Sequence, residues 1–337
     1  MRSAILDIGS NSAHLKIVDL RPGEPIRDVR SVKRPTRLAE SITLDGRLGP
    51  AAAGRLGAAV SGALAVARDE GAEELVAFAT SALRDAVNRE EIVAGLAART
   101  GVEPAFLSGE DEARLTFLAA RGWYGWSAGP LLLADIGGGS LEIAAGDGAE
   151  PAFAMSLPLG AGRLTRDHLP GDPPGRSDAK ALRRFVRDRL AECLPAEPFA
   201  GRVRPIATSK IFTQLARLNR RRNAAGDRIL RRKDLRDRIP RLAAMTADER
   251  AGLKGVSPSR ARQILAGAVI AEEVMRHLGL KRLEICPWAL REGIALRRIQ
   301  HLDGLSRHGD DIDHLLRPMP ERRARLRAVG EVGESVS

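Results

Sequence analysis

Short apolar runs with strand-like alternation follow one another along the chain, separated by longer segments with helical apolar spacing. From residue 4 to 121 the pattern predicts a strand hairpin followed by alternating strands and helices, and the order then begins again with a second hairpin. Strands that alternate with helices are typical of α/β layers, so we expect two α/β halves that face each other across a cleft. The predicted elements are hairpin 4–19, a strand-rich segment 26–44, helix 50–70, strand 74–79, helix 88–99, strand 103–107 and helix 110–121, then hairpin 131–147, strand 152–157, helix 178–192, strand 203–207, helices 210–221, 233–243, 246–252 and 258–278, strand 282–286 and helix 289–301.

The two predicted hairpins resemble each other at a fixed offset. The segment from Ile5 to Leu15 aligns with the segment from Leu133 to Ile143, and each reads as an apolar strand, a small-residue turn and a second strand. Three polar pairs coincide: Asp7 with Asp135, Ser12 with Ser140 and His14 with Glu142. This repeat favours a function for the turns over a pair of ordinary glycine hairpins with surface acids.

The chemistry of these turns suits an anion and a cation together. Small residues let the backbone fold tightly and bring its N–H groups to an anion. Because side chains alternate along a strand, Asp135 and Glu142 can face one cleft from the two arms of the hairpin. Two such carboxylates suit a hard divalent cation such as Mg²⁺. The turns are neither a Walker loop nor a dinucleotide fingerprint, since no Gly-Lys-Ser/Thr follows and the glycines are contiguous.

The composition describes an ordinary globular protein. Of its 337 residues, 44% are hydrophobic and 29% are charged, so the chain can bury a large core and is not globally disordered. Its two cysteines, Cys193 and Cys286, form neither a disulfide framework nor a zinc motif. No apolar run approaches the roughly 20 residues of a membrane span, and Asp7 interrupts the apolar start that a secretory leader needs. We therefore expect a soluble, cytoplasmic protein without a membrane partner.

Positive charge is concentrated in one segment. Residues 217–241, which we call the basic strip, hold eleven Arg and Lys side chains and three Asp side chains, in a chain with a formal net charge of +11. Such a segment is either a docking surface for a long anion or a solvated helix surface, and composition does not separate the two. Only 3% of the residues are aromatic, which argues against a nucleic-acid partner bound by base stacking.

The paired turns, Asp-Ile-Gly-Ser-Asn-Ser from Asp7 and Asp-Ile-Gly-Gly-Gly-Ser-Leu-Glu from Asp135, resemble the phosphate motifs of the exopolyphosphatase/guanosine pentaphosphate phosphatase (Ppx/GppA) family. Further segments resemble that family in the same order, over about residues 3–300: 79–86, 107–115, 156–165, 207–210, 256–261 and 289–293. The likeness is strongest to the short, two-domain actinobacterial exopolyphosphatases, since the chain has no room for the additional C-terminal domain of longer relatives.

The resemblance implies an α/β fold with two actin/Hsp70/sugar-kinase-like (ribonuclease H-like) domains and an interdomain cleft. We expect domain I over residues 1–122 and domain II over 128–288, with a helix over about 289–302 that packs back on domain I. Residues 305–337 have mixed charge, prolines and no apolar period, so we expect a poorly ordered tail there.

The resemblance also implies roles for individual residues. Glu112 corresponds to the proposed general base, and Asp135 and Glu142 correspond to ligands of Mg²⁺, with Mn²⁺ as an alternative ion. The implied phosphate-binding residues are Gly9, Ser10, Asn11, Ser12, His14, Arg84, Gly137, Gly138, Gly139 and Ser140. A homodimer is usual among the relatives.

The residues themselves leave alternatives open for Glu112 and Arg84. Glu112 could orient and deprotonate a water, but Ser108 with Asp111 reads as a capping box that Glu112 would merely decorate. Arg84 offers a planar fork for phosphate oxygens, but it could equally be a surface arginine of a helix.

Three places depart from the family pattern. His14 stands where many members have a phosphate-binding arginine; a neutral histidine would make binding of the terminal phosphate weaker or dependent on pH, or His14 could simply pack. Ala207 and Lys210 replace a glycine-threonine turn, and Cys286-Pro287-Trp288 replaces a more polar turn. These departures bear on chain-length preference and on contacts of the second domain.

Aromatic residues gather at two places where the chain crosses between the halves. Trp123, Tyr124 and Trp126 lie before the second hairpin, and Trp288 lies before the last helix. We expect these rings to form the hinge or the contact between the domains, in preference to a nucleotide-stacking site.

The function that fits best is a Mg²⁺-dependent exopolyphosphatase, which releases terminal phosphate from inorganic polyphosphate by direct attack of water and uses the basic strip to guide the substrate. The nearest alternative is a guanosine pentaphosphate (pppGpp) 5′-phosphohydrolase of the stringent response. An alternative of another class is a non-catalytic polyphosphate or nucleotide sensor, against which the Glu112, Asp135 and Glu142 set argues. A kinase of the same superfamily is a poorer fit, because residues 207–210 make a poor adenosine-binding turn.

Overall fold

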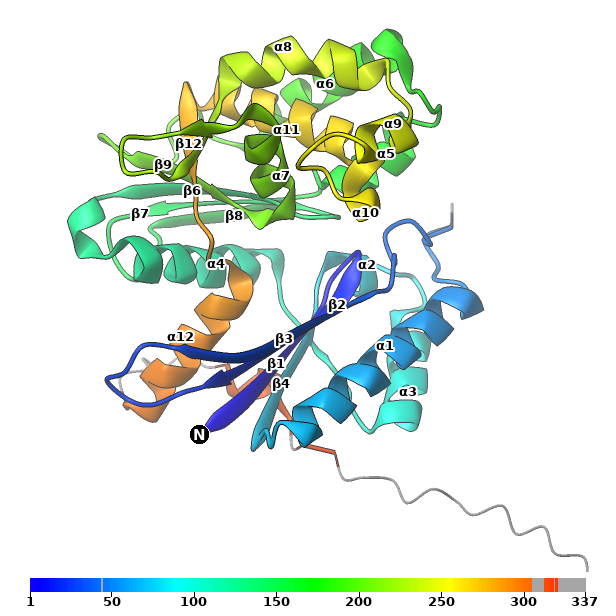
Figure 1. The fold of residues 1–337 in the computed structure, drawn as a ribbon, viewed down its shortest axis with the longest axis vertical. Helices are drawn as coiled ribbons and strands as arrows, with labels where there is room; N and C mark the ends of the chain where they lie inside the picture. The colour runs from blue at the N-terminus through cyan, green and yellow to red at the C-terminus, as the bar shows by residue number, and fades with distance from the viewer. Residues whose placement is uncertain (44, 305–311, 318, 321–337) are drawn as a thin grey trace, which may run out of the picture.

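The computed structural model describes residues 1–43, 45–304, 312–317 and 319–320, and it has two halves, each built on one β-sheet (Figure 1). In the first sheet the strand order is β13-β4-β1-β2-β3, with β5 beside β4. Strand β2 is antiparallel to β1 and β3, whereas β4 is parallel to β1 and to β5. The strands are β1 (Arg2–Ile8), β2 (Ser12–Asp19), β3 (Arg27–Pro35), β4 (Glu74–Ala79), β5 (Ala105–Phe106) and β13 (Leu316–Arg317).

The second sheet repeats the arrangement of the first. Its strand order is β10-β11-β12-β9-β6-β7-β8, in which β7 is antiparallel to β6 and β8, and β9 is parallel to β6 and β12. Strands β6, β7, β8, β9 and β12 therefore correspond in order and direction to β1, β2, β3, β4 and β5, so the duplication seen in the two hairpins extends over both sheets. The strands are β6 (Leu131–Ile136), β7 (Leu141–Gly146), β8 (Phe153–Leu157), β9 (Arg204–Thr208), β10 (Arg221–Arg222), β11 (Arg228–Arg231) and β12 (Arg282–Ile285).

Helices cover both faces of each sheet because strand residues alternate between the faces. On β1, Leu6 shares a buried cluster with α1 and α3, whereas its neighbour Ile5 shares one with α12. On β6, Leu132 faces α6, α7, α8 and α11, whereas Leu133 faces α4. The helices are α1 (Pro50–Asp69), α2 (Ser81–Arg84), α3 (Arg89–Thr100), α4 (Gly109–Tyr124), η1 (Trp126–Ala128), α5 (Ala161–His168), α6 (Gly175–Cys193), α7 (Ser209–Asn219), α8 (Arg232–Ala243), α9 (Ala247–Ala251), α10 (Pro258–Ala261), α11 (Ile264–His277), α12 (Leu290–Leu302) and η2 (Asp313–Leu315).

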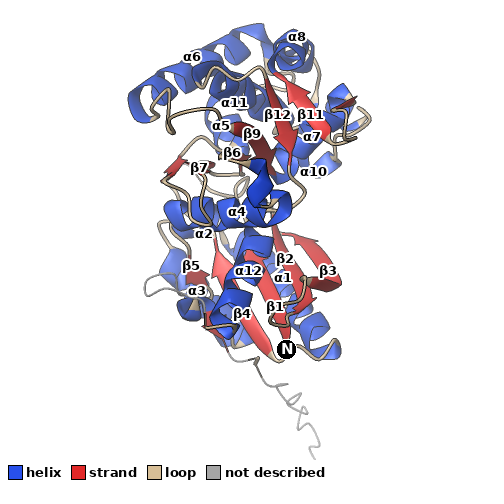
Figure 2. Cartoon of the chain, turned by 90° about the vertical axis from the view of Figure 1, so that its left-hand side faces the viewer, coloured by secondary structure: helices blue, strands red, loops and turns tan. Residues whose placement is uncertain are grey.

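Helix α4 lies between the two halves (Figure 2). Ala113, Phe117 and Ala120 pack on the second sheet, whereas Leu115 joins the cluster between the first sheet and α12. The crossing with α12 is very close, because a Cβ added at Gly293 would lie 1.8 Å from the carbonyl oxygen of Leu115. A helix whose residues were assigned to domain I thus forms part of the core of both halves.

Part of the expected tail is ordered against the first sheet. Ile312 and Leu315 are buried, and β13 pairs antiparallel with β4 through Leu316 and Val76. The expectation of a poorly ordered tail is therefore wrong for residues 312–317, because these apolar side chains fill a cluster with Val76 and Phe78. The remaining tail residues, 305–311, 318 and 321–337, lie outside the described part of the chain.

Helix α1 is long and apolar enough to cross a membrane when length and composition alone are considered. In the fold it packs on the first sheet, where Leu56, Val60 and Leu64 are buried in the core. The core helix of a soluble protein meets the same criteria, so α1 is weak evidence for a membrane span.

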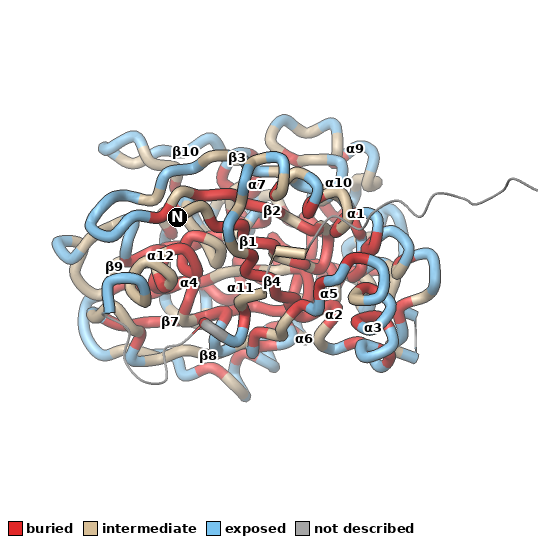
Figure 3. The backbone as a smooth tube through the Cα atoms, turned by 90° about the horizontal axis from the view of Figure 1, so that it is seen from below, coloured by how far each residue is buried: buried red, intermediate tan, exposed pale blue. Residues whose placement is uncertain are grey.

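The basic strip does not form one helical surface. A strand pair, β10 and β11, lies between the predicted helices 210–221 and 233–243, with Arg221 opposite Ile229 and Arg222 opposite Arg228. This pair extends the second sheet at its edge, where β10 is exposed (Figure 3). Helix α8 then carries the rest of the strip over the outer side of the second half (Figure 1).

Candidate active site between the two halves

The two glycine turns have the same construction. Asp7 pairs with His14 across β1 and β2, and Asp135 pairs with Glu142 across β6 and β7. Each turn is closed by the same backbone hydrogen bond, from Gly9 N to Ser12 O at 3.1 Å and from Gly137 N to Ser140 O at 2.9 Å. The two hairpins, which were aligned by their sequences, therefore share one strand register.

The turns face each other and are in contact. A Cβ added at Gly138 would lie 2.6 Å from the Cβ of Ser10, and one added at Gly139 would lie 2.3 Å from the Oγ of Ser81. Because real Cβ atoms do not come this close, both positions require glycine. Ser10 and Ser81 in turn approach each other with 3.2 Å between their hydroxyl oxygens.

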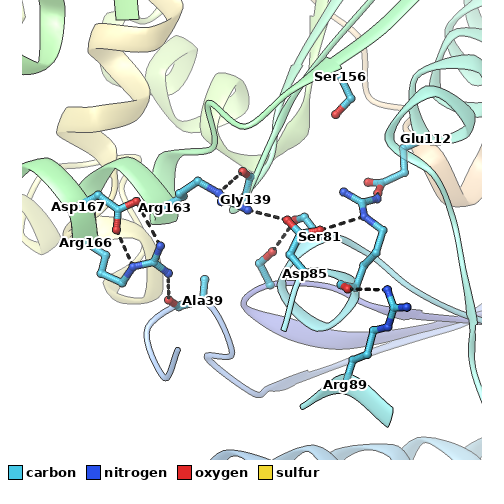
Figure 4. Close-up of polar contacts among 12 residues, drawn as sticks. Ala39, Ser81, Asp85, Arg89, Glu112, Gly139, Ser156, Arg163, Arg166 and Asp167 are labelled. Carbon is cyan, nitrogen blue, oxygen red and sulfur yellow. Dashed lines mark hydrogen bonds and ion pairs between the residues drawn. The ribbon is translucent and has the colours of Figure 1, made fainter. Parts of the chain in front are cut away.

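Two polar links hold the halves together beside the turns. The Nε2 atom of Gln263 donates a hydrogen bond to Asn11 Oδ1 at 2.8 Å. The Nη2 atom of Arg163, in α5, lies 2.6 Å from Asp85 Oδ2, while its Nε donates to the carbonyl of Gly139 in the second turn at 3.0 Å (Figure 4). Arg163 therefore connects the second turn to the end of α2, where Arg84 lies.

Glu112 and Arg84 form a buried pair at this junction. Glu112 is 8% exposed, and its Oε1 accepts a hydrogen bond from Arg84 Nη1 at 2.7 Å. The same Nη1 donates to the carbonyl of Leu107 at 2.7 Å. The capping box of Ser108 and Asp111 is present at the start of α4, yet the Glu112 carboxylate bonds to Arg84 in the site (Figure 4). Glu112 and Arg84 therefore contact each other within the site and are not solvent-exposed side chains of their helices.

Burial raises the pKa values of three carboxyl groups in the site. Burial, and then the Glu142 charge, raise the pKa of Asp135 to about 8. Burial raises the pKa of Glu142 to about 7, against the hydrogen bond that Ser156 Oγ donates to it at 2.9 Å. Burial and Glu142 also raise the pKa of Glu112 well above its usual range, despite Arg84. Carboxylates destabilised by burial and by one another would be stabilised by a cation.

The residues present fit a divalent cation of the Mg²⁺ type. Asp135 and Glu142 supply hard oxygen ligands from adjacent strands, and Mg²⁺ commonly uses one or two carboxylates together with waters and substrate phosphates. Over the part of the chain that the structure describes, no group of three or more His, Cys, Asp and Glu side chains could hold a metal ion. Within the described residues, Asp135 and Glu142 therefore leave coordination positions that waters or phosphate oxygens could fill.

The first hairpin differs from the second because cationic side chains lie beside its aspartate. Asp7 Oδ2 accepts a hydrogen bond from Arg291 Nη1 at 2.6 Å, and the buried Nε of Arg291 has no partner within the described residues. Burial, then the charges of Arg291 and Lys33, lower the pKa of His14 to about 3, so His14 is neutral at physiological pH. Its Nε2 lies 2.7 Å from Ser31 Oγ. Positive charge here comes from Arg291 and Lys33 and not from His14.

Several residues of this site were not predicted from the sequence. Arg291 lies in a segment that carries the family resemblance, which was the available signal, but its contact with Asp7 joins positions far apart in the chain. Asp85 and Arg163 also lie in segments that carry the resemblance, 79–86 and 156–165, but nothing in the sequence pointed to the contact between them. The other cations near the cleft are Lys33, Lys210 and Arg260, whose charges act on one another.

The two aromatic segments meet as expected. Trp123, near the end of α4, lies with its ring centroid 5.7 Å from that of Trp288, which precedes α12. A Cβ added at Gly122 would lie 3.2 Å from the Trp288 ring. Trp123 and Trp126 are 47% and 68% exposed, so their outer faces contact solvent. The rings form a contact between the halves, and a hinge motion there stays a prediction.

Comparisons with known proteins agree with this geometry. A model of the Ppx/GppA phosphatase family matches residues 16–302. The protein named exopolyphosphatase 1 of Mycobacterium tuberculosis is 48% identical over 304 residues, which cover 89% of this chain and 88% of that protein. Exopolyphosphatase 2 of the same species is 33% identical over 312 residues, covering 88% and 98%.

Solved structures share the fold. The crystal structure of an exopolyphosphatase-like protein matches with a TM-score of 0.79 at 26% identity, covering 89% of this chain and 98% of that one. A family member from Aquifex aeolicus matches with a TM-score of 0.72 at 24% identity, covering 91% and 99%. The expected two-lobed, actin-like α/β fold is thereby confirmed. The chain belongs to the Ppx/GppA phosphatase family.

Proposed function

We propose that this protein is an exopolyphosphatase, which releases terminal orthophosphate from inorganic polyphosphate by direct attack of water. The names of the two mycobacterial relatives support this substrate class. The observation that carries the proposal is the burial of Glu112 against Arg84, beside the carboxylates of the second glycine turn. A phosphate bound between the turns would lie next to a base, an arginine and a cation site at once.

Glu112 is the proposed general base. A carboxylate is most effective as a base when its pKa lies near the working pH, and burial together with Glu142 moves the pKa of Glu112 in that direction. Arg84 holds one carboxylate oxygen by a 2.7 Å hydrogen bond, which fixes the orientation of the group. The role of Arg84 would be to position Glu112 in the resting state and to bind phosphate oxygens when substrate enters.

The glycine turns are the proposed phosphate cradle. Gly9 to Ser12 and Gly137 to Ser140 approach closely because Gly138 and Gly139 lack a Cβ, so that the side chains of Ser10 and Ser81 lie directly against the second turn. Backbone N–H groups and the hydroxyls of Ser10, Ser12 and Ser140 can then approach the oxygens of a phosphoryl group directly. On the first hairpin, the unpartnered Nε of Arg291 is the cationic donor that His14 does not supply.

Asp135 and Glu142 are the proposed ligands of Mg²⁺ or Mn²⁺. When bound, such an ion would offset charge on the transferred phosphoryl group. The two residues would hold it through oxygens that burial and mutual repulsion make unfavourable as bare anions. Ser156 would keep Glu142 in place through its 2.9 Å hydrogen bond.

The test is a comparison of phosphate release by wild type, Glu112→Gln and Glu110→Gln. Glu110 lies in the same helical turn but is exposed and bonded to Arg114, so it controls for loss of a negative charge at the start of α4. Short polyphosphate, long polyphosphate and pppGpp are each supplied with and without Mg²⁺. We expect Mg²⁺-dependent release from polyphosphate, a loss of about 10²- to 10⁴-fold in Glu112→Gln, and wild-type rates in Glu110→Gln.

The other outcomes discriminate between functions. Release from pppGpp alone would reassign the protein as a pppGpp phosphohydrolase. Binding of either compound without release would replace catalysis by a sensor role. A phosphorylated protein trapped during turnover would contradict direct attack by water. The homodimer that the resemblance implies stays a prediction, which sedimentation of the purified protein would test. The cytoplasmic location expected from the cysteine content stays a prediction as well.

A further inference from the structure

Residues of the basic strip line two surface cavities that differ in charge. One, of about 340 Å³, is lined by Arg217, Arg220, Arg228, Lys254 and Gly255, a set without a carboxylate. We call it the cationic hollow. The neighbouring cavity, of about 280 Å³, is lined by Arg221, Arg238 and Arg241 together with Asn219 and two acids, Asp234 and Asp237. Charge in the second cavity is therefore compensated locally, whereas charge in the hollow is not compensated by the residues that line it.

The cationic hollow is connected to the active site by helix α7. This helix starts at Ser209, directly after Thr208, which is the strand partner of Asp135. Lys210 lies in its first turn and Arg217 two turns later on the same face, about 10 Å farther along the helix axis. Both side chains are exposed. Lys210 and Arg217 thus form a line of positive charge that leads from the cleft to the hollow.

The cations along this line repel one another. Burial lowers the pKa of Lys33 to about 8, and the charges of Arg260, Lys210 and Arg291 contribute. Partial burial at the inner end of the exposed Lys210 side chain, followed by the charges of Arg217 and Arg260, lowers the pKa of Lys210 as well. Mutual repulsion of this kind is relieved by an anion that contacts several cations in succession. A single phosphate reaches only one end of the line, but a phosphate chain can follow it.

The backbone of Arg220 supports a role for its side chain. Arg220 ends α7 with φ 52° and ψ 24°, in the left-handed region where glycine is favoured. An arginine at this place destabilises the fold relative to glycine. Such a cost is most readily understood where the side chain has a use outside the fold. Its side chain lines the cationic hollow.

We propose that the cationic hollow is a second binding site for substrate, which holds the distal part of an inorganic polyphosphate chain while the terminal phosphate lies between the glycine turns. The proposal rests on the proposed function and specifies which part of the basic strip serves it. Arg217, Arg220, Arg228 and Lys254 bind the chain, and the cavity with Asp234 and Asp237 does not. No aromatic ring lines the hollow, which favours polyphosphate over a single-stranded nucleic acid that stacks on aromatic side chains.

The experiment compares two full-length double variants with equal charge. Arg220→Gly with Lys254→Ala removes two cations from the hollow, and Arg236→Ala with Arg241→Ala removes two exposed cations from α8 in the same strip. Affinities for long-chain polyphosphate and for tripolyphosphate are measured by calorimetry without Mg²⁺, so that hydrolysis does not interfere. Because Arg220→Gly relieves an unfavourable backbone conformation, its thermal midpoint shows whether any loss of binding is a folding defect.

We expect the hollow variant to lower the ratio of long-chain to tripolyphosphate affinity by about three- to tenfold, with a smaller salt dependence than wild type. The α8 variant should keep the wild-type ratio. An unchanged ratio in the hollow variant, or an equal loss in both variants, would overturn the proposal. Competition by single-stranded RNA as effective as that by polyphosphate would overturn it in favour of a nucleic-acid site. If wild type hydrolyses polyphosphate while the variants behave alike, this inference alone fails; if wild type neither binds nor hydrolyses it, the proposed function fails.

Discussion

Replacing Gly160 by alanine should damage the active site without changing a residue that touches substrate. Gly160 precedes α5 and packs against the second glycine turn, so that an added Cβ would lie 2.2 Å from the carbonyl carbon of Gly139 and 2.4 Å from the nitrogen of Ser140. The backbone at Gly160 has φ −82° and ψ 149°, which alanine adopts without strain. The effect of the substitution is therefore purely steric.

The size of the effect follows from the overlap. Carbon atoms in contact are separated by about 3.5 Å, so the turn must retreat by about 1.3 Å to accept a Cβ at 2.2 Å. Misplacement of reacting groups by about 1 Å can lower a rate by about 10²-fold. Overpacking of this kind also lowers the free energy of unfolding by about 1–3 kcal/mol. We expect a folded protein with a large loss of activity.

The assay measures phosphate release from polyphosphate, together with urea unfolding, for wild type, Gly160→Ala and Gly95→Ala. Gly95 lies within α3 with nothing within 4 Å of an added Cβ, so alanine there should keep full activity and stabilise the helix by about 0.5–1 kcal/mol. If Gly160→Ala kept kcat/KM within about threefold of wild type, the close packing beneath the second turn would not be what positions the phosphate.

Three further predictions concern the contacts around the site. Gly293→Ala would place a Cβ 1.8 Å from the carbonyl oxygen of Leu115, so we expect loss of soluble folded protein, or a thermal midpoint far below that of wild type. A thermal midpoint near the wild-type value would contradict the close crossing of α4 and α12. Arg163→Ala removes both the partly exposed ion pair with Asp85 and the hydrogen bond to the Gly139 carbonyl, so stability should fall by about 1–3 kcal/mol. Because the lost bond holds the second turn, kcat/KM should fall by at least about tenfold in protein that is still fully folded at the assay temperature; a wild-type kcat/KM in the folded variant would show that the link is only structural. The pKa of His14 is about 3 in the folded protein and about 6.5 in the unfolded chain, so between these pH values the unfolded state binds more protons and the free energy of unfolding falls as pH falls, by at most about 1.4 kcal/mol per pH unit. Urea unfolding of wild type and His14→Gln from pH 7 to 4 should therefore show a shallower decline in the variant. Parallel curves would refute the assignment of a neutral, buried His14.

The sequence predicted those features that repeat or that follow a local period. The two hairpins could be aligned because their turn residues repeat, and strand alternation predicted that Asp135 and Glu142 face one cleft. In the fold these two residues are strand partners, as are Asp7 and His14. The small residues of the turns also indicated close approach, since Gly138 and Gly139 have no room for a side chain. Both kinds of information are carried by neighbouring residues.

Features that depend on distant parts of the chain were missed. The strand pair β10 and β11 adds to the edge of a sheet whose neighbouring strand, β12, comes about 50 residues later, so no strand was predicted between the helices 210–221 and 233–243. Helix α5, which packs against the second turn, was not predicted either. Its backbone amides at Ala161 and Gly162 donate hydrogen bonds to carbonyl oxygens of that turn. Such tertiary contacts override local preference.

The same limit explains why two similar hairpins acquire different chemistry. From the sequence, Asp7 and Asp135 occupy equivalent positions and could serve equivalent roles. In the fold, α12 crosses back and places Arg291 on Asp7, so the charge of the first aspartate is already compensated at 2.6 Å. Asp135 has no such arginine bonded to it among the described contacts, and its neighbour Glu142 adds a further negative charge. The two hairpins thus share one shape but differ in charge. Helix α12 brings Arg291 to the first hairpin and suits it to an anion, whereas the carboxyl groups of Asp135 and Glu142 suit the second to a cation.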